Sequence, residues 1–357
     1  MRRSHSTLLP FAALLAVVSA GCGKPAEPPP AAERNAAPVV DKSQLQIFAP
    51  LPANVPGERA ATEELITLGR MLYYEPRLSK SQTISCNTCH DLANYGVDGE
   101  PTSDGHKGQK GDRNSPTVYN AAAHFAQFWD GRAADVEEQA KGPVLNPVEM
   151  AMASEAKVVA VLRSMPEYVD LFKKAFPGDT RPITYDNMAR AIGAFERRLM
   201  TPSRWDALLA GDETALTASE RVGLKTYLET GCQACHNGAL LGGTSYQRIG
   251  AVKPYARSAD PGRFNLTKND ADRAVFKVPS LRNVEKTGPY YHDGGVASLE
   301  DAVRQMAEYQ LGKTLTPEET KAIIDFLKVL TGRIDPEYIK PPVLPKSTAT
   351  TPKPDIS

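Results

Sequence analysis

The sequence predicts a mostly α-helical protein with two similar domains and long loops. Helix start signals recur along the chain, whereas convincing alternating strand patterns are missing from it. A second observation is a weak internal repeat, in which "ELITLGRMLYYEPRLSKSQTISCNTCH" resembles "ASERVGLKTYLETGCQACH". In both copies a helical stretch with a central glycine and a following aromatic residue leads into Cys-x-x-Cys-His. The chain has 357 residues, which is enough for two domains with their own cores.

Three helices are predicted from the residues that begin them. Thr217 and Glu220 form a capping box at the start of the second copy of the repeat. Ser298 is the expected N-cap of "SLEDAVRQMAEYQ", and Thr316 opens "TPEETKAIIDFLKVL" with a proline at the first helical position. The apolar residues of this last helix follow the spacing i, i+3, i+4, i+7 and predict a core-facing stripe of Ile323, Phe326, Leu327 and Leu330.

The amino-terminal residues predict export. Two arginines precede the apolar run Leu8–Val18, which is too short to cross a membrane, so residues 1–22 are typical of a secretory signal. Cleavage before Gly21 would suit an ordinary signal peptidase. Alternatively, "SAGC" resembles a bacterial lipobox, with Cys22 as the lipidated residue, which would account for a fifth cysteine in an exported chain. We expect a periplasmic protein that is anchored to a membrane as a lipoprotein.

Composition and charge are those of an ordinary globular protein. Hydrophobic residues make up 41% of the chain and charged residues 24%, and the formal net charge is +0. The sequence has no basic run and no basic patch with interleaved aromatic residues, which argues against a nucleic-acid partner. Residues 23–58 are rich in Pro and Ala and predict a semi-stiff linker, and residues 341–357 predict a disordered tail. The two expected domains are then 59–215 and 216–340.

The pentapeptide Cys-x-x-Cys-His carries the strongest chemical signal. Two thiols at this spacing can add to the two vinyl groups of one haem, and the adjacent histidine then becomes an axial ligand of the iron. A Cys-x-x-Cys without the following histidine would be equally compatible with a redox-active disulfide or with half of a zinc site. Two complete copies in an exported chain predict two covalently bound c-type haems, attached at Cys86, Cys89 and His90 and at Cys232, Cys235 and His236.

The sixth ligand of each iron must come from the remaining histidines and methionines. His106 lies in the glycine-rich, charged loop Asp98–Asn114, where a histidine is more often a solvated side chain. His124 and His292 are further candidates. Met306 lies on a predicted helix, where a methionine more often packs in the core than binds a metal.

Four further segments resemble the bacterial dihaem cytochrome c peroxidases, a family that includes relatives of MauG. They are "FWDGRAADVEEQAKGPVLNPVEM", "RNSPTVYN", "GPYYHDGG" and "SLEDAVRQMAEYQLG", and the resemblance runs from about residue 65 to 330. It implies two cytochrome-c-like haem domains. The first haem would be the low-potential peroxidatic centre, with His90 as proximal ligand. The second would be the high-potential centre where electrons enter, with His236 and Met306 as axial ligands; a thioether ligand raises the potential of a haem.

The same resemblance implies roles for residues near the first haem. Trp129 corresponds to a tryptophan between the two haems, and Gln139 and Glu149 correspond to residues on the peroxide side. A carboxylate there can move a proton between the two oxygens of peroxide, and an amide can orient the peroxide molecule. His106 corresponds to a histidine that in most of the family ligates the peroxidatic iron of the fully oxidised enzyme. That ligand leaves when the other haem is reduced, for which a glycine-rich loop is suited.

A calcium site is also implied, at Asn114, Thr287 and Pro289. It would use one side-chain carbonyl, two backbone carbonyls and waters, all hard oxygen ligands, and the low carboxylate count predicts moderate affinity. His124 and His292 match no ligand position and are expected to be structural.

These observations predict an exported enzyme that reduces hydrogen peroxide to water. Its electrons would come from a small cytochrome c or a copper protein (a cupredoxin), and the family's usual state is a homodimer. One alternative is a MauG-like oxidase of a protein substrate, although that relative has a tyrosine where Met306 stands. Another is a non-enzymatic dihaem electron carrier, in which both irons stay six-coordinate and Glu149 has no catalytic role.

Overall fold

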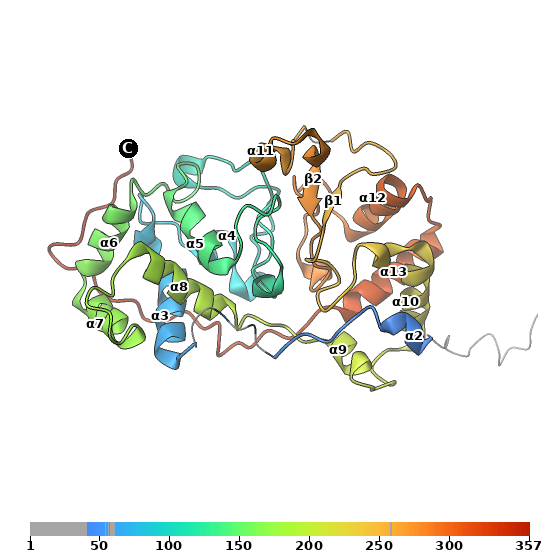
Figure 1. The fold of residues 1–357 in the computed structure, drawn as a ribbon, viewed down its shortest axis with the longest axis horizontal. Coiled ribbons are helices and arrows are strands. Elements are labelled where there is room, and N and C mark those ends of the chain that lie inside the picture. Colours follow the sequence, from blue (N-terminus) through green and yellow to red (C-terminus); the bar gives the residue numbers. More distant parts are fainter. Residues whose placement is uncertain (1–40, 54, 56, 58–60, 258) are drawn as a thin grey trace, which may run out of the picture. The chain divides into compact units, whose positions relative to one another are not determined.

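The computed structural model describes residues 41–53, 55, 57, 61–257 and 259–357 (Figure 1). The predicted signal at 1–22, the lipidated Cys22 and the first part of the linker therefore lie outside the described residues. None of the helices in the described part of the chain has the length and hydrophobicity that a membrane crossing requires.

The fold is mostly helical, as predicted. In the described ranges the only sheet is one antiparallel pair of strands, in which Tyr246 lies opposite Lys277 and Arg248 opposite Val275. The strands are β1 (Tyr246–Arg248) and β2 (Val275–Lys277). The helices are α2 (Lys42–Leu45), α3 (Glu63–Tyr73), α4 (Cys86–Cys89), α5 (Val136–Leu145), α6 (Glu155–Arg163), α7 (Pro166–Ala175), α8 (Tyr185–Glu196), α9 (Arg204–Leu209), α10 (Ala218–Thr230), α11 (Phe264–Thr267), α12 (Leu299–Leu311) and α13 (Pro317–Val329).

The three helices predicted from their caps all form. The Thr217 side chain accepts a hydrogen bond from the Glu220 backbone at the start of α10, and Thr316 does the same for Glu319 at the start of α13. Ser298 caps α12 through the Asp301 backbone N–H. The predicted apolar stripe of α13 is buried at all its positions. Local cap chemistry was sufficient to place these helices.

The first buried core is organised by the contact of α3 with α8 (Figure 1). Gly69 of α3 lies so close to the backbone of α8 that a Cβ there would overlap the carbonyl oxygen of Ala191. The ring of Tyr73 packs on Phe195, with ring centroids 5.4 Å apart. A glycine therefore allows the two helix backbones to approach closely, and an aromatic pair fills the space beside it.

The second core repeats this arrangement with α10 and α13. A Cβ at Gly223 would overlap the carbonyl oxygen of Ala322, and Tyr227 packs on Phe326 with ring centroids 5.0 Å apart. The internal repeat read from the sequence thus corresponds to a repeated helix pair. The glycine and aromatic residue of each copy occupy equivalent places.

The two cores do not follow the expected domain border between 215 and 216. Trp205, on α9, is fully buried in the second core, where Phe48 packs on it with ring centroids 5.2 Å apart. Phe48 belongs to the predicted linker, so part of that segment contributes to a core. Tyr338 instead packs against the first core. The chain therefore passes between the two cores more than once, and each core is built from apolar residues that lie far apart in the sequence.

Residues 341–357 make defined contacts, in contrast to the predicted disordered tail. The Arg77 guanidinium donates a 2.8 Å hydrogen bond to the carbonyl oxygen of Pro345. Thr351 is buried and accepts a 2.9 Å hydrogen bond from Ser164. The tail has too few apolar residues to form a core, and the polar groups of the first core hold it instead.

Candidate active site

A cavity of about 800 Å³ brings together most of the predicted peroxidatic residues. A cavity of this volume lies within the range of sites for cofactors and ligands. Its walls come from α4, from the loops around 103–118 and 127–132, from α5 and the turn after it, and from the end of α8. The predicted site residues that line it are Cys86, Cys89, His90, Asn114, Trp129, Gln139 and Glu149.

The first motif forms a single helical turn that presents its side chains to the cavity. Ser85 and Thr88 form a capping box at α4, and the N–H of His90 closes the turn on the Cys86 carbonyl at 3.0 Å. The Tyr73 hydroxyl donates to the His90 carbonyl at 2.8 Å. Removal from water lowers the pKa of His90, which favours the neutral imidazole that binds metals.

The donor set fits a covalently attached haem. Within the described residues all cysteines are free thiols, and no hydrogen bond engages the buried Nδ1 of His90. Two free thiols and a buried imidazole on one helical turn are the groups that a covalently attached haem uses. Burial raises the pKa of both Cys86 and Cys89, so these thiols are protonated in the absence of such a group.

Glu149 lies in the turn that follows α5. The Asn146 amide donates to its Oε1 at 2.8 Å. Burial raises the pKa of Glu149, against the opposing effects of Arg132 and Asn146. A carboxyl group that retains its proton to higher pH is suited to give and take protons. Gln139 reaches the same cavity from α5, whose start is capped by Asp135.

Trp129 connects the cavity to the strand pair. Its indole Nε1 donates to the Asn114 carbonyl at 2.9 Å, and its own carbonyl accepts from the Lys277 backbone at 2.7 Å. The Asn114 N–H donates to the His292 carbonyl at 2.8 Å. Trp129 is therefore tied on one side to the cavity loop and on the other to β2.

His106 is buried, contrary to the local expectation of a solvated side chain. It begins the short 3-10 turn His106–Gly108 and is only 5% exposed. Its N–H donates to the Glu149 carbonyl at 2.8 Å and to the Val148 carbonyl at 3.1 Å. The ring Nε2 lies 3.4 Å from the Ser357 carbonyl oxygen, while no residue in the described ranges bonds Nδ1.

The second motif repeats the local geometry of the first. The Tyr227 hydroxyl donates to the His236 carbonyl at 2.6 Å, as Tyr73 does to His90. His236 Nδ1 lies 3.2 Å from the Leu241 carbonyl oxygen, which accepts its proton and leaves Nε2 available as a ligand. Burial lowers the pKa of His236. Met306 lies half-buried on α12, and its role as a ligand stays a prediction.

The predicted calcium ligands come from two separate segments. The Asn114 amide donates to the Glu100 carbonyl at 3.1 Å. Thr287 ends the 3-10 turn Val284–Lys286, and Pro289 follows it after a cis peptide bond. Asn114 is joined to the second segment through His292.

Sequence reasoning missed two buried ionisable groups near the site. Glu196 lines the cavity at 4% exposure, and burial, with a smaller effect of Glu137, raises its pKa to about 8. Lys277 is 7% exposed, its Nζ lies 2.5 Å from His124 Nδ1, and burial lowers its pKa to about 7. The position of Lys277 as a lone charged residue inside the apolar run "AVFKVP" is the sequence signal that could have revealed this buried lysine.

A third missed feature is an arginine that joins distant loops. Arg113 forms ion pairs with Asp130 at 2.7 Å and with Asp260 at 2.6 Å. All three line the cavity. No local pattern indicates this contact, because Asp260 lies far along the chain.

Comparison with known proteins agrees with this geometry. The profile of the family described as di-haem cytochrome c peroxidase matches residues 63–214. A relative from Pseudomonas aeruginosa named cytochrome c551 peroxidase is 49% identical over 315 residues, covering 86% of this chain and 90% of that protein. A protein of the same name from Nitrosomonas europaea is 49% identical over 81% of this chain and 86% of its own length.

A solved structure gives a similar result. The crystal structure of a MauG-like protein associated with microbial copper homeostasis matches with a TM-score of 0.72 at 29% identity, covering 82% of this chain and 97% of that one. Fold, site and likeness together point to the haem-dependent peroxidases as a class. The chain belongs to the di-haem cytochrome c peroxidase family, which MauG proteins share.

Proposed function

We propose that this chain is a periplasmic peroxidase that reduces hydrogen peroxide to water with electrons from a small cytochrome c or a cupredoxin. Membership in the family makes it an enzyme that acts on peroxide. The observation that carries the residue assignments is the cavity in which Cys86, Cys89 and His90 face the same space as Gln139 and Glu149.

Two haems are proposed, one at each motif. Cys86 and Cys89 would hold the first by thioether bonds with His90 on its iron, and Cys232, Cys235 and His236 would hold the second. When bound, haem supplies an iron that binds peroxide at the first site and one that passes electrons at the second. Met306 is proposed as the other ligand at the second site, and a methionine there suits electron entry because a thioether raises the potential.

The residues around the first site have separate tasks. One peroxide molecule takes up two electrons and two protons and leaves as two water molecules. Glu149 would carry a proton from the inner to the outer peroxide oxygen, for which its raised pKa is suited. Gln139 would orient the peroxide through its amide. Trp129 would couple the two sites, supported by its bonds to the cavity loop and to β2.

His106 is proposed as the removable ligand that closes the first site in the oxidised enzyme. Among the described residues its ring has a single, long hydrogen bond, to the Ser357 carbonyl oxygen, although the residue is buried. A Cβ at either Gly99 or Gly108 would meet no atom within 4 Å. The loop is loosely packed at these two glycines, so its movement must chiefly break the backbone hydrogen bonds of His106, at a cost on the order of a few kcal/mol.

Calcium, the assembly and the anchor complete the proposal. Asn114, Thr287 and Pro289 would bind Ca²⁺ through oxygen atoms, which are the ligands that this ion prefers. A homodimer, and acyl chains on Cys22, are proposed from the family resemblance and the lipobox pattern.

The test of the function is the variant Glu149→Gln. We expect it to keep both haems and slow steady-state peroxide reduction, with a reduced small cytochrome c as donor, by about a hundredfold, because a positioned proton-transfer group is lost. The control is Glu138→Gln, an exposed carboxylate on α5. If Glu149→Gln turns over within a factor of about two of the wild type, a group other than Glu149 transfers the proton.

A further inference from the structure

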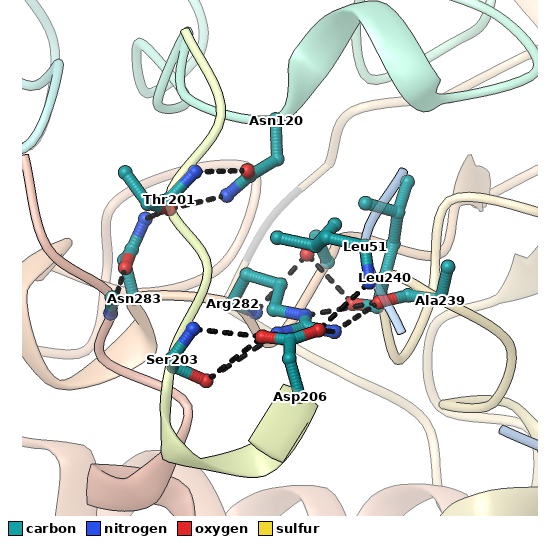
Figure 2. Close-up of polar contacts among 11 residues, drawn as sticks. Leu51, Asn120, Thr201, Ser203, Asp206, Ala239, Leu240, Arg282 and Asn283 are labelled. Atoms are coloured by element: carbon teal, nitrogen blue, oxygen red, sulfur yellow. Dashed lines mark hydrogen bonds and ion pairs between the residues drawn. The ribbon is translucent and has the colours of Figure 1, made fainter. Parts of the chain in front are cut away.

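Three consecutive carbonyl groups follow the second motif, and each is held by the segment 280–282. The Ala239 carbonyl accepts from the Arg282 guanidinium, from Nε at 2.9 Å and from Nη2 at 2.7 Å. The Leu240 carbonyl accepts from the Ser280 hydroxyl at 2.7 Å, and the Leu241 carbonyl accepts from the Leu281 N–H at 3.2 Å. Figure 2 shows Ala239 and Leu240 beside Arg282.

The last of these carbonyls is also the partner of His236. The Leu241 oxygen lies 3.2 Å from His236 Nδ1, so it accepts from the imidazole and from the Leu281 backbone. Its position therefore depends on the two carbonyls that precede it. A shift of the 239–241 segment would lengthen or break the bond to the imidazole.

Arg282 is the residue that anchors this segment. Its side chain is 0% exposed, and its charge is balanced by Asp206, with Nη1 to Oδ2 at 2.6 Å and Nη2 to Oδ1 at 2.8 Å (Figure 2). The planar guanidinium bonds a carboxylate with one edge and a carbonyl with another, which a lysine cannot reproduce.

Asp206 is itself fixed by the backbone. Its Oδ1 accepts from the Leu51 N–H and its Oδ2 from the Ser203 N–H, each at 2.7 Å. Hydrogen bonding and the charge of Arg282 hold the pKa of Asp206 below its ordinary value in spite of burial. The ion pair is therefore a rigid link between the start of α9 and the loop after the second motif.

We propose that Asp206 and Arg282 are positioning residues for His236, which set the strength of its bond to the Leu241 carbonyl and thereby the reduction potential of the second haem. The inference rests on the proposed function, in which His236 is a ligand of that haem. A carbonyl that accepts the Nδ1 proton makes the imidazole a stronger electron donor. Stronger donation stabilises the oxidised iron, so loosening this bond raises the potential.

The experiment compares Arg282→Lys with the wild-type holoenzyme by spectroelectrochemical titration of both haems. We expect the potential of the second haem to rise by about 59 mV, which corresponds to a tenfold change in a one-electron equilibrium. The potential of the first haem should stay unchanged. Asp206→Glu keeps the charge and should give a smaller rise than Asp206→Asn.

The matched control is Arg77→Lys. Arg77 forms an equally buried pair with Glu75 in the first core, so its replacement should lower stability in urea without moving the second potential. Ser280→Ala is a milder variant, which removes one hydroxyl from the same segment. It should raise the reduction potential of the second haem by less than Arg282→Lys does. It supplies the measurement if Arg282→Lys does not fold.

Two results separate failure of this inference from failure of the proposed function. If Arg282→Lys or Ser280→Ala lowers stability and leaves the second potential unchanged, the positioning role is refuted. If His236→Ala leaves the spectrum of the second haem unchanged, His236 is not its ligand, and the proposed function fails at that point.

Discussion

The backbone N–H of His106 donates a hydrogen bond to the carbonyl oxygen of Glu149, with an N···O distance of 2.8 Å. The proposed gating histidine and the proposed proton carrier therefore belong to one hydrogen-bonded unit. Gly105 packs so closely on the Val148 backbone that a Cβ there would overlap its carbonyl oxygen. A displacement of the His106 backbone must either break these contacts or move the Glu149 backbone with it, so we expect opening of the gate and the position of Glu149 to be coupled.

His106→Gly tests the gate without removing that coupling, because glycine keeps the backbone N–H. We expect a first haem that reacts with peroxide in the fully oxidised enzyme, without prior reduction, since its removable ligand is absent. Rapid mixing of the oxidised variant with peroxide measures this reaction. Lys107→Gly is the control, because Lys107 is exposed and has a φ of 60°, which glycine adopts readily. An oxidised spectrum and an activation requirement like those of the wild type would refute the gate.

Glu196 predicts a pH dependence of stability. Burial raises its pKa to about 8, whereas a glutamate in the unfolded chain has its ordinary pKa of about 4.5. Below the lower value both states are protonated, and between the two values only the unfolded state is ionised. The free energy of unfolding therefore falls as pH rises through this window, by up to about 1.4 kcal/mol per pH unit.

Glu196→Gln removes this titration. We expect the variant to match the wild type near pH 4, below both values, and to be more stable than it at pH 8, as measured by urea unfolding of the holoenzyme. Glu155→Gln, at an exposed position, is the control, and its stability relative to the wild type should not change with pH in this way. Parallel pH profiles for the wild type and Glu196→Gln would contradict the raised pKa.

Gly223→Ala tests the helix contact of the second core. The added Cβ would overlap the Ala322 carbonyl, so α10 and α13 must separate. We expect a loss of about 1–3 kcal/mol in the free energy of unfolding, as for other overpacked cores. Gly111→Ala is the control, since a Cβ there has room. A variant of unchanged stability would mean that the helices tolerate the methyl group.

Removal of residues 345–357 tests the ordered tail. The deletion leaves Arg77 without the Pro345 carbonyl and the Ser347 hydroxyl, which accept from it at 2.8 and 3.0 Å. Unsatisfied buried donors cost about 1–3 kcal/mol, so we expect a lower midpoint of unfolding in urea and faster proteolysis near residue 77. Deletion of 356–357 is the control, because it keeps both Arg77 contacts and removes the contacts of Ser357 with Lys80 and His106. Equal midpoints for both deletions would show that the Arg77 contacts contribute no stability.

Much of the fold could be read from local patterns because their physics is local. The Thr217–Glu220 and Thr316–Glu319 caps satisfy backbone groups within one helical turn, so four residues are enough to recognise them. The two Cys-x-x-Cys-His motifs carry their spacing in five residues. The resemblance then led to Gln139, Trp129 and Glu149, which the structure gathers around one cavity.

By itself, the sequence determined the helical class and the repeat, and it located the two Cys-x-x-Cys-His motifs on which the proposed haem attachment rests. Only the tertiary structure decided which charges are buried and what pairs with them. Arg282 meets Asp206 across 76 positions, and Arg77 meets Pro345 across 268. No local pattern specifies such contacts, because the environment of a buried charge is made by segments that come together only when the whole chain folds.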